Sequence, residues 1–123
     1  MEMAQPRQII SADYPFLRVR VGIGGQRTEA LALIDTGFDG AVAVPEGWLD
    51  GTRNDPEGFV PLQMADGSIS YAPVFVGIVE IIGFPALTGT PITVLGVEYM
   101  LGREVIDLYR VTLDHGTRVI VEP

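Results

Sequence analysis

Residues 31–37 have the sequence Leu-Ala-Leu-Ile-Asp-Thr-Gly, in which four apolar residues lead directly into a carboxylate. The apolar run favours a buried strand. A charge at the end of such a strand costs free energy unless it is hydrogen-bonded, paired or used in chemistry. Gly37 permits a tight turn and the close approach of another backbone. We therefore expect Asp35 to be held rigidly on a turn and to point into a cleft. The alternative is an aspartate that only caps the turn.

The Asp-Thr-Gly triplet occurs once in the 123 residues. Chemistry that needs two such carboxylates would therefore need a second copy of the chain. Composition narrows the other possibilities. The chain has no cysteine, a single histidine (His115) and no lysine, and its net charge is -8. Thiolate chemistry, multi-histidine metal sites and lysine Schiff bases are excluded within one chain. An acidic surface also disfavours nucleic acid as a partner.

Short strand-like runs, separated by many of the 15 glycines and nine prolines, surround the triplet. Residues 16–23 alternate with period two, which predicts a half-buried strand. Gly24-Gly25 then predicts a hairpin, with residues 28–34 as the returning strand. Asp66-Gly67 and His115-Gly116 predict two more hairpins. Further strands are expected over 41–44, 59–64, 69–76, 77–82, 92–95, 109–113 and 118–121, with a loop over 48–58 and a helix over 102–108.

The sequence thus predicts an all-β, mostly antiparallel, closed or partly open barrel with one short helix near the C-terminus. Residues 1–123 are expected to form a single domain, with residues 1–13 loosely held. No run approaches the roughly 20 apolar residues of a membrane span. Residues 1–8 lack the apolar core of a signal peptide. We expect a soluble, cytoplasmic protein that does not contact a membrane.

The order of three motifs carries a family resemblance. An apolar strand ends in Asp35-Thr36-Gly37, the Asp66-Gly67 hairpin follows, and Met100-Leu101-Gly102-Arg103 leads into the predicted helix. This order resembles the retropepsin-like aspartic proteases, a single-domain family that includes retroviral proteases and small cellular relatives. The resemblance extends from about Phe16 to Val121.

The resemblance implies a role for each matching residue. Asp35 corresponds to the catalytic aspartate. Thr36 corresponds to the residue that braces the two active-site turns across a dimer, and Gly37 to the residue whose carbonyl meets the substrate backbone. Asp39 and Arg103 correspond to residues that form an ion pair, which here would tie the active-site turn to the helix.

The hairpin around residues 64–70 corresponds to the flap that closes over a bound peptide. Its tip is formed by Ala65, Asp66, Gly67 and Ser68, which we expect to bind substrate together with Phe38 and Asp39. Phe38 departs from the family, which usually has Ala or Ser at this position. Its ring could fill a substrate pocket, narrow that pocket or turn into the core.

The function implied is that of an aspartic endopeptidase acting on extended, largely apolar peptides, without metal or cofactor. Two Asp35 side chains, one from each subunit of a homodimer, would share a proton. One would activate a water while the other protonates the peptide carbonyl. Residues 118–121 are candidates for intersubunit pairing. The alternatives are a catalytically silent dimeric peptide-binding module, in which Phe38 blocks the pocket, and a monomeric β-barrel that binds a small ligand.

Overall fold

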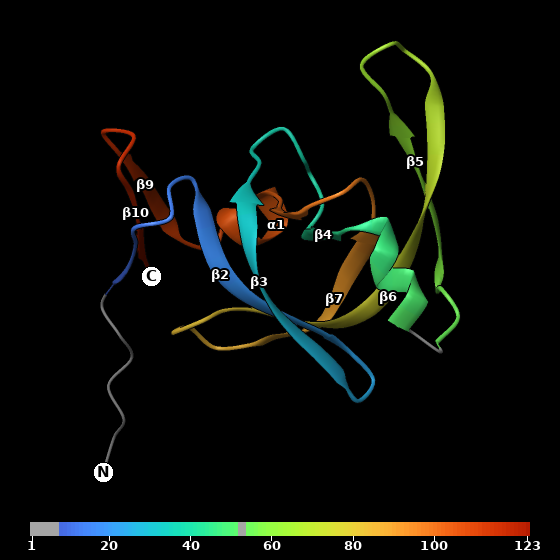
Figure 1. Cartoon of the computed structure of the whole chain (residues 1–123), viewed down its shortest axis with the longest axis horizontal. Coiled ribbons are helices and arrows are strands. Elements are labelled where there is room, and N and C mark those ends of the chain that lie inside the picture. Colours follow the sequence, from blue (N-terminus) through green and yellow to red (C-terminus); the bar gives the residue numbers. More distant parts are fainter. Residues whose placement is uncertain (1–7, 52–53) are drawn as a thin grey trace.

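The computed structural model describes residues 8–51 and 54–123 (Figure 1). Its strands are β1 (Ile9–Ser11), β2 (Phe16–Ile23), β3 (Gln26–Ile34), β4 (Val42–Val44), β5 (Gly58–Gln63), β6 (Ile69–Ile81), β7 (Leu87–Val94), β8 (Tyr99–Leu101), β9 (Arg110–Asp114) and β10 (Arg118–Glu122). The described residues also form two helical segments, the 3-10 helix η1 (Glu46–Gly51) and the α-helix α1 (Arg103–Ile106).

Six strands close into a barrel. They follow one another in the order β2, β3, β8, β4, β7 and β6, and β6 pairs with β2 to complete the circle. Strand β5 extends this sheet by pairing with the outer part of β6. The pairings β3–β8 and β4–β7 are parallel, and the others in the barrel are antiparallel. The predicted all-β barrel with one short helix is confirmed.

The barrel interior is filled by small and branched side chains from every wall. On β2 the alternation seen in the sequence holds, because Leu17, Val19 and Val21 are buried while Arg18 is exposed. The largest fully buried side chains are Phe75, Leu17, Ile92, Leu101, Val19, Val21, Val42, Val44, Val79, Val105, Val119 and Val121. Burial of this apolar surface is the main favourable contribution to folding.

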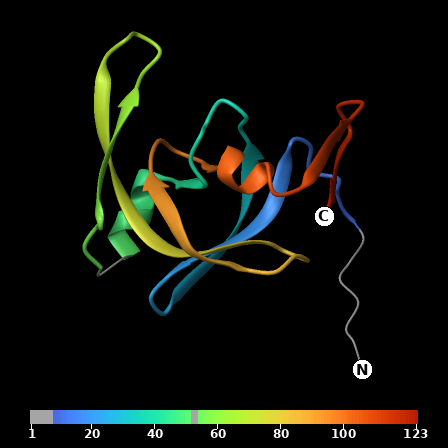
Figure 2. The ribbon, with the colours of Figure 1, turned by 180° about the vertical axis from the view of Figure 1, so that it is seen from behind.

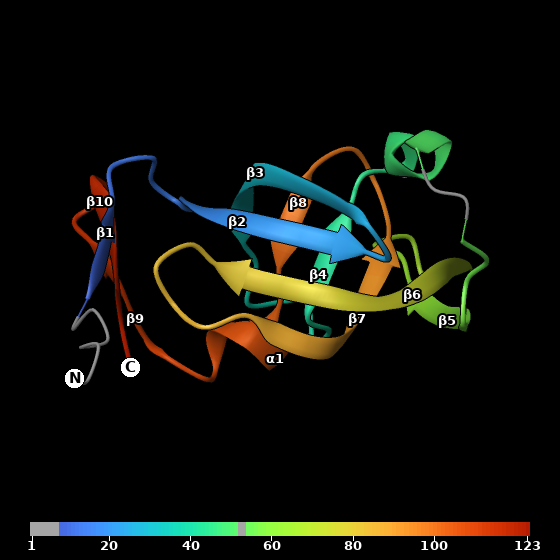
Figure 3. The same ribbon diagram turned by 90° about the horizontal axis from the view of Figure 1, so that it is seen from below.

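A second, three-stranded sheet lies at one end of the molecule, beside the barrel (Figure 3). Strand β10 is its middle strand and pairs with β1 on one edge and β9 on the other. Because both edges of β10 are occupied, residues 118–121 cannot add a strand from another subunit, and that expectation is wrong. Within the segment 1–13 that we expected to be loosely held, Ile9–Ser11 forms β1; residues 1–7 lie outside the described ranges.

Several elements besides β1 differ from the sequence prediction. The expected loop over 48–58 contains part of η1, strand β8 was not predicted, and α1 spans four residues instead of 102–108. The helix gives way after Ile106 to a tighter turn, in which the Leu108 and Tyr109 N–H groups donate to the Val105 and Ile106 carbonyls, and β9 begins at Arg110. In the described residues, no helix has the length and apolar character needed to cross a bilayer.

Close packing of two strands makes Gly77 a sensitive position. A Cβ built at Gly77 would lie 2.0 Å from the carbonyl oxygen of Gly22, across the β2–β6 pairing. The same atom at Gly58, in β5, would meet nothing within 4 Å. We expect Gly77→Ala to lower the free energy of unfolding by about 1–3 kcal/mol, since backbone must shift. Chemical denaturation should show this loss, with Gly58→Ala as the control. Equal stability of the two variants would contradict the packing.

The terminal hairpin has its own charge contacts. The Asp114 carboxylate contacts the Arg118 Nε at 2.6 Å and the His115 Nδ1 at 2.5 Å. These contacts hold the pKa of the Asp114 carboxyl below its ordinary value of 3.8, and the hydrogen bond from Arg118 contributes most to this shift. A lowered pKa in the folded state stabilises the fold above that ordinary value, and the benefit is lost as pH falls through the folded-state pKa.

We therefore expect Asp114→Asn to reduce thermal stability slightly at neutral pH, with a difference that shrinks as pH falls below 3.8. Melting curves across this range measure the difference. Arg118→Gln should give the same trend, because it removes the same contact from the other side. A deficit that stays constant down to the lowest pH at which the protein folds would contradict this account.

Candidate active site

The turn after β3 fixes Asp35 through three hydrogen bonds. The Asp35 N–H donates to the Leu101 carbonyl at 3.0 Å, and the Asp35 carbonyl accepts from the Phe38 N–H at 3.2 Å. The side-chain Oδ1 accepts from the Gly37 N–H at 2.9 Å. The turn-capping contact expected of an ordinary turn aspartate is therefore present. It uses one carboxylate oxygen, and within the described residues Oδ2 has no hydrogen-bond partner.

The segment that follows this turn is clasped against the start of α1. The Arg103 N–H donates to the Phe38 carbonyl at 2.9 Å and the Glu104 N–H to the Gly40 carbonyl at 3.1 Å. The Gly102 N–H donates to the Ala41 carbonyl at 2.8 Å. The contact is so close that a Cβ at Gly102 would lie 2.1 Å from the Gly40 oxygen. Figure 2 shows α1 beside the loop that follows β3.

A groove of about 430 Å³ opens at this turn. The β5–β6 hairpin projects beyond the barrel on the same side as the loop after β3, and both contribute to the groove (Figure 1). Its lining residues are Asp35, Gly37, Phe38, Asp39, Pro61, Leu62, Gln63, Met64, Ala65, Leu95, Met100 and Arg103. The turn that carries Asp35 thus faces a groove with mixed polar and apolar walls, which is bordered by a long hairpin.

Most of the predicted site residues meet in this groove, but not all. Thr36 is exposed beside Asp35 and does not line it. Asp66, Gly67 and Ser68 lie at the exposed hairpin tip, beyond the lining residues. At that tip the Ser68 hydroxyl and N–H both donate to Asp66 Oδ1 and lower the pKa of its carboxyl, so the tip carries a negative charge.

Sequence reasoning missed five groove residues, which are Leu95, Met100 and, on strand β5, Pro61, Leu62 and Gln63. A signal for Met100 was available, because it alternates with Leu101 on a strand. Leu101 is fully buried, so its neighbour faces the other side. That argument needs β8 to be identified as a strand, and β8 has only three residues. Leu95 directly follows β7 and carried no comparable signal.

Asp39 and Arg103 both line the groove, but the expected ion pair is not formed. The ion pairs of the described residues join Arg20 to Glu29 and Glu80, and Asp114 to His115 and Arg118. The turn and the helix are tied instead by the backbone hydrogen bonds from the N–H groups of residues 102–104. A backbone clasp of this kind needs no particular side-chain charge.

The Phe38 ring lies against two glycines. A Cβ at Gly40 would be 2.6 Å from the ring Cζ, and a Cβ at Gly102 would be 2.7 Å from its Cδ2. The ring therefore occupies the space that side chains at these positions would fill. It is half-buried and lines the groove, so it lies on the groove wall and is not part of the buried core.

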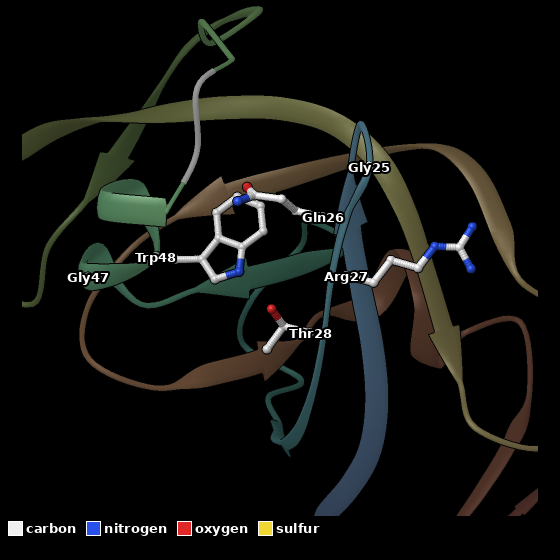
Figure 4. Close-up of a pocket in the computed structure, with 6 residues that line it drawn as sticks. All are labelled: Gly25, Gln26, Arg27, Thr28, Gly47 and Trp48. Carbon is white, nitrogen blue, oxygen red and sulfur yellow. The ribbon is translucent and has the colours of Figure 1, made fainter.

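Another hollow, of about 460 Å³, is lined by Gly25, Gln26, Arg27, Thr28, Gly47 and Trp48. Figure 4 shows the Thr28 hydroxyl directed toward the Trp48 indole, while the Arg27 guanidinium points away from it. None of these lining residues has a carboxylate, so this hollow does not suit acid–base chemistry. In the part of the chain that the structure describes, no cluster of three or more His, Cys, Asp or Glu side chains could hold a metal.

Comparison with known proteins supports the fold. No protein-family model matches the chain. No curated protein matches it in sequence either. Among solved structures, the chain is similar to the crystal structure of a retropepsin-like aspartic protease from Rickettsia conorii, with a TM-score of 0.60 and 14% identity over 93% of this chain and 89% of that one. At this identity the likeness shows the fold alone, which is retropepsin-like.

The contact between Phe38 and Gly40 allows a double-mutant test. We expect Gly40→Ala to destabilise the protein by about 1–3 kcal/mol, because its Cβ would meet the Phe38 ring. In a Phe38→Ala background the same change should be nearly neutral. Gly102→Ala should stay destabilising in both backgrounds, since its Cβ also meets the Gly40 carbonyl oxygen. Denaturant titration gives the coupling energy between positions 38 and 40. If the effects of Gly40→Ala and Phe38→Ala are additive, the Phe38 ring does not pack against Gly40.

Proposed function

We propose that this chain is an aspartic endopeptidase of the retropepsin type, active as a homodimer. The observation that carries the proposal is the position of Asp35. It stands on a turn fixed by three hydrogen bonds, and it lines a groove bordered by the β5–β6 hairpin in a retropepsin-like fold. The fold by itself does not define an activity. The carboxylate in the groove is the feature that favours hydrolysis.

The proposed mechanism uses one Asp35 from each chain. Two carboxyl groups at hydrogen-bonding distance share one proton, because both cannot be ionised so close together. The ionised group takes a proton from a water, that water attacks the peptide carbonyl carbon, and the protonated group gives its proton to the carbonyl oxygen, which forms a gem-diol. The C–N bond then breaks as the first carboxyl passes its proton to the leaving nitrogen and the second carboxylate takes a proton from one diol hydroxyl, which restores the shared proton. Gly37 and Thr36 are exposed beside Asp35, so a second chain can approach the turn.

The groove favours an extended peptide as the substrate. The β5–β6 hairpin contributes Pro61, Leu62 and Met64 to its lining, and the barrel contributes Leu95 and Met100. An extended chain that lies between a hairpin and a groove floor can pair with the strands while its side chains contact apolar walls. In this proposal the hairpin acts as a flap, and Ala65 to Ser68 form its tip.

A catalytically silent peptide-binding module with the same fold is the second candidate. It is favoured by one observation, which is that Phe38 lines the groove close to Asp35. The two candidates share the fold, the groove and the dimer. They differ only in whether a bound peptide is hydrolysed.

We expect Asp35→Asn to lower the rate of peptide cleavage by roughly 100-fold or more, since an amide cannot exchange the proton. Mass spectrometry of a digested peptide library measures the loss. Asp55→Asn is the matched control, because Asp55 is exposed and lies outside the groove lining. Cleavage that survives Asp35→Asn unchanged would exclude the proposed role of Asp35.

Sedimentation equilibrium of the same samples separates the candidates. A dimer that cleaves peptides only with Asp35 intact supports the peptidase, and a dimer that binds peptides without cleaving them supports the silent module. A strict monomer would contradict both and would favour a small-ligand barrel.

A further inference from the structure

The Phe38 ring packs into the space beside Gly40 and Gly102. Its Cζ and Cε1 lie 2.6 and 2.8 Å from the Cβ position of Gly40, and its Cδ2 lies 2.7 Å from that of Gly102. A real Cβ atom at either glycine could not lie within 3.0 Å of the ring. The ring therefore occupies the volume that the missing side chains of Gly40 and Gly102 leave empty. With a small residue at position 38, this volume would be an open recess in the groove wall.

The backbone of Phe38 is held on both sides. Its N–H donates to the Asp35 carbonyl at 3.2 Å, and its carbonyl accepts from the Arg103 N–H at 2.9 Å. The ring therefore cannot leave the recess by a movement of the main chain without breaking the turn that fixes Asp35. Rotation about its own side-chain bonds is the movement of the ring that leaves these two hydrogen bonds intact.

The recess also lies close to the proposed reaction centre. Phe38 is three residues after Asp35, and both line the same groove together with Met100 and Leu95. A peptide that places its carbonyl at Asp35 must direct a nearby side chain toward this wall, because successive side chains of an extended chain alternate in direction.

We propose that the Phe38 ring fills the subsite beside Asp35 and restricts the substrate there to a small side chain, such as Gly, Ala or Ser. The inference rests on the proposed function. In a symmetric dimer each chain contributes one such ring, so the restriction applies once on each side of the scissile bond. A larger side chain would have to displace a ring whose backbone is fixed, and even one methylene group in a filled pocket changes selectivity about tenfold or more.

A binding experiment tests this without relying on hydrolysis. Peptides that carry a non-cleavable hydroxyethylene group in place of the scissile bond are made with Ala, Val, Leu or Phe at each flanking position in turn. Calorimetry then measures the Kd of each for the native protein and for Phe38→Ala. At one position on each side, we expect the native protein to bind Ala at least about tenfold more tightly than Phe. Phe38→Ala should remove or reverse that preference and leave the other positions unchanged.

Two further variants keep the experiment decisive. Leu95→Ala enlarges the same groove at another wall residue, and it should not relax the positions that respond to Phe38→Ala. Phe38→Leu shortens the ring while keeping an apolar side chain, and it replaces Phe38→Ala if thermal melting shows that the latter is unfolded. An intermediate preference for Phe38→Leu would support the proposal.

The proposal fails if the native protein and Phe38→Ala have the same profile, if the native protein prefers Phe at the responding position, or if neither binds any peptide of the series. The first two results leave the proposed function intact when cleavage still depends on Asp35. Conversely, cleavage that does not depend on Asp35, together with the expected change in profile, would overturn the peptidase and leave the subsite in place.

Discussion

The clasp between the turn after β3 and the start of α1 is the constraint on which the rest of this structure depends. Three backbone N–H groups, from residues 102–104, donate to the carbonyls of Ala41, Phe38 and Gly40. The two segments approach so closely that a Cβ at Gly102 would lie 2.1 Å from the Gly40 carbonyl oxygen. Because the bonds are between main-chain atoms, they fix the path of the chain itself and leave the side chains of the turn available for chemistry.

The clasp also explains how a small barrel can present a carboxylate at its rim. Strand β8 pairs with β3 in parallel and with β4 in antiparallel register, so the chain before and after the turn is joined through the same three residues. The Leu101 carbonyl at the end of β8 receives the Asp35 N–H. Asp35 is thus attached to two strands and a helix, and a carboxylate fixed in this way would need little reorganisation in the proposed hydrolysis.

Local signals predicted much of the fold, and long-range pairing explains what they missed. Gly24-Gly25, Asp66-Gly67 and His115-Gly116 each form the expected hairpin, because their backbones favour the required turns. Strands β1 and β8 have three residues each and exist only because distant partners flank them. The equally short β4 was predicted from its apolar run, whereas β1 and β8 are defined by their pairing with distant strands.

The same distinction applies to the site. Asp35 and Gly37 could be predicted from their position after an apolar strand, and they line the groove. Met100 and Leu95 were not predicted, because their place in the groove depends on how the barrel closes. The family resemblance implied an ion pair between Asp39 and Arg103, and here a backbone clasp joins the two segments instead. Main-chain geometry can therefore preserve an arrangement while the side-chain contacts around it change.

The packing of Phe38 limits which side chains the turn after β3 can carry. A large ring follows the Asp-Thr-Gly turn only because the clasp leaves two glycines beneath it, so the choice of residue at position 38 depends on those at 40 and 102. A substitution that enlarges either glycine acts on the ring, and a substitution of the ring acts on the groove wall next to Asp35. Stability and the proposed selectivity therefore depend on the same contact. In this chain, a change in the shape of that wall at Phe38 also changes the packing of the turn that carries Asp35.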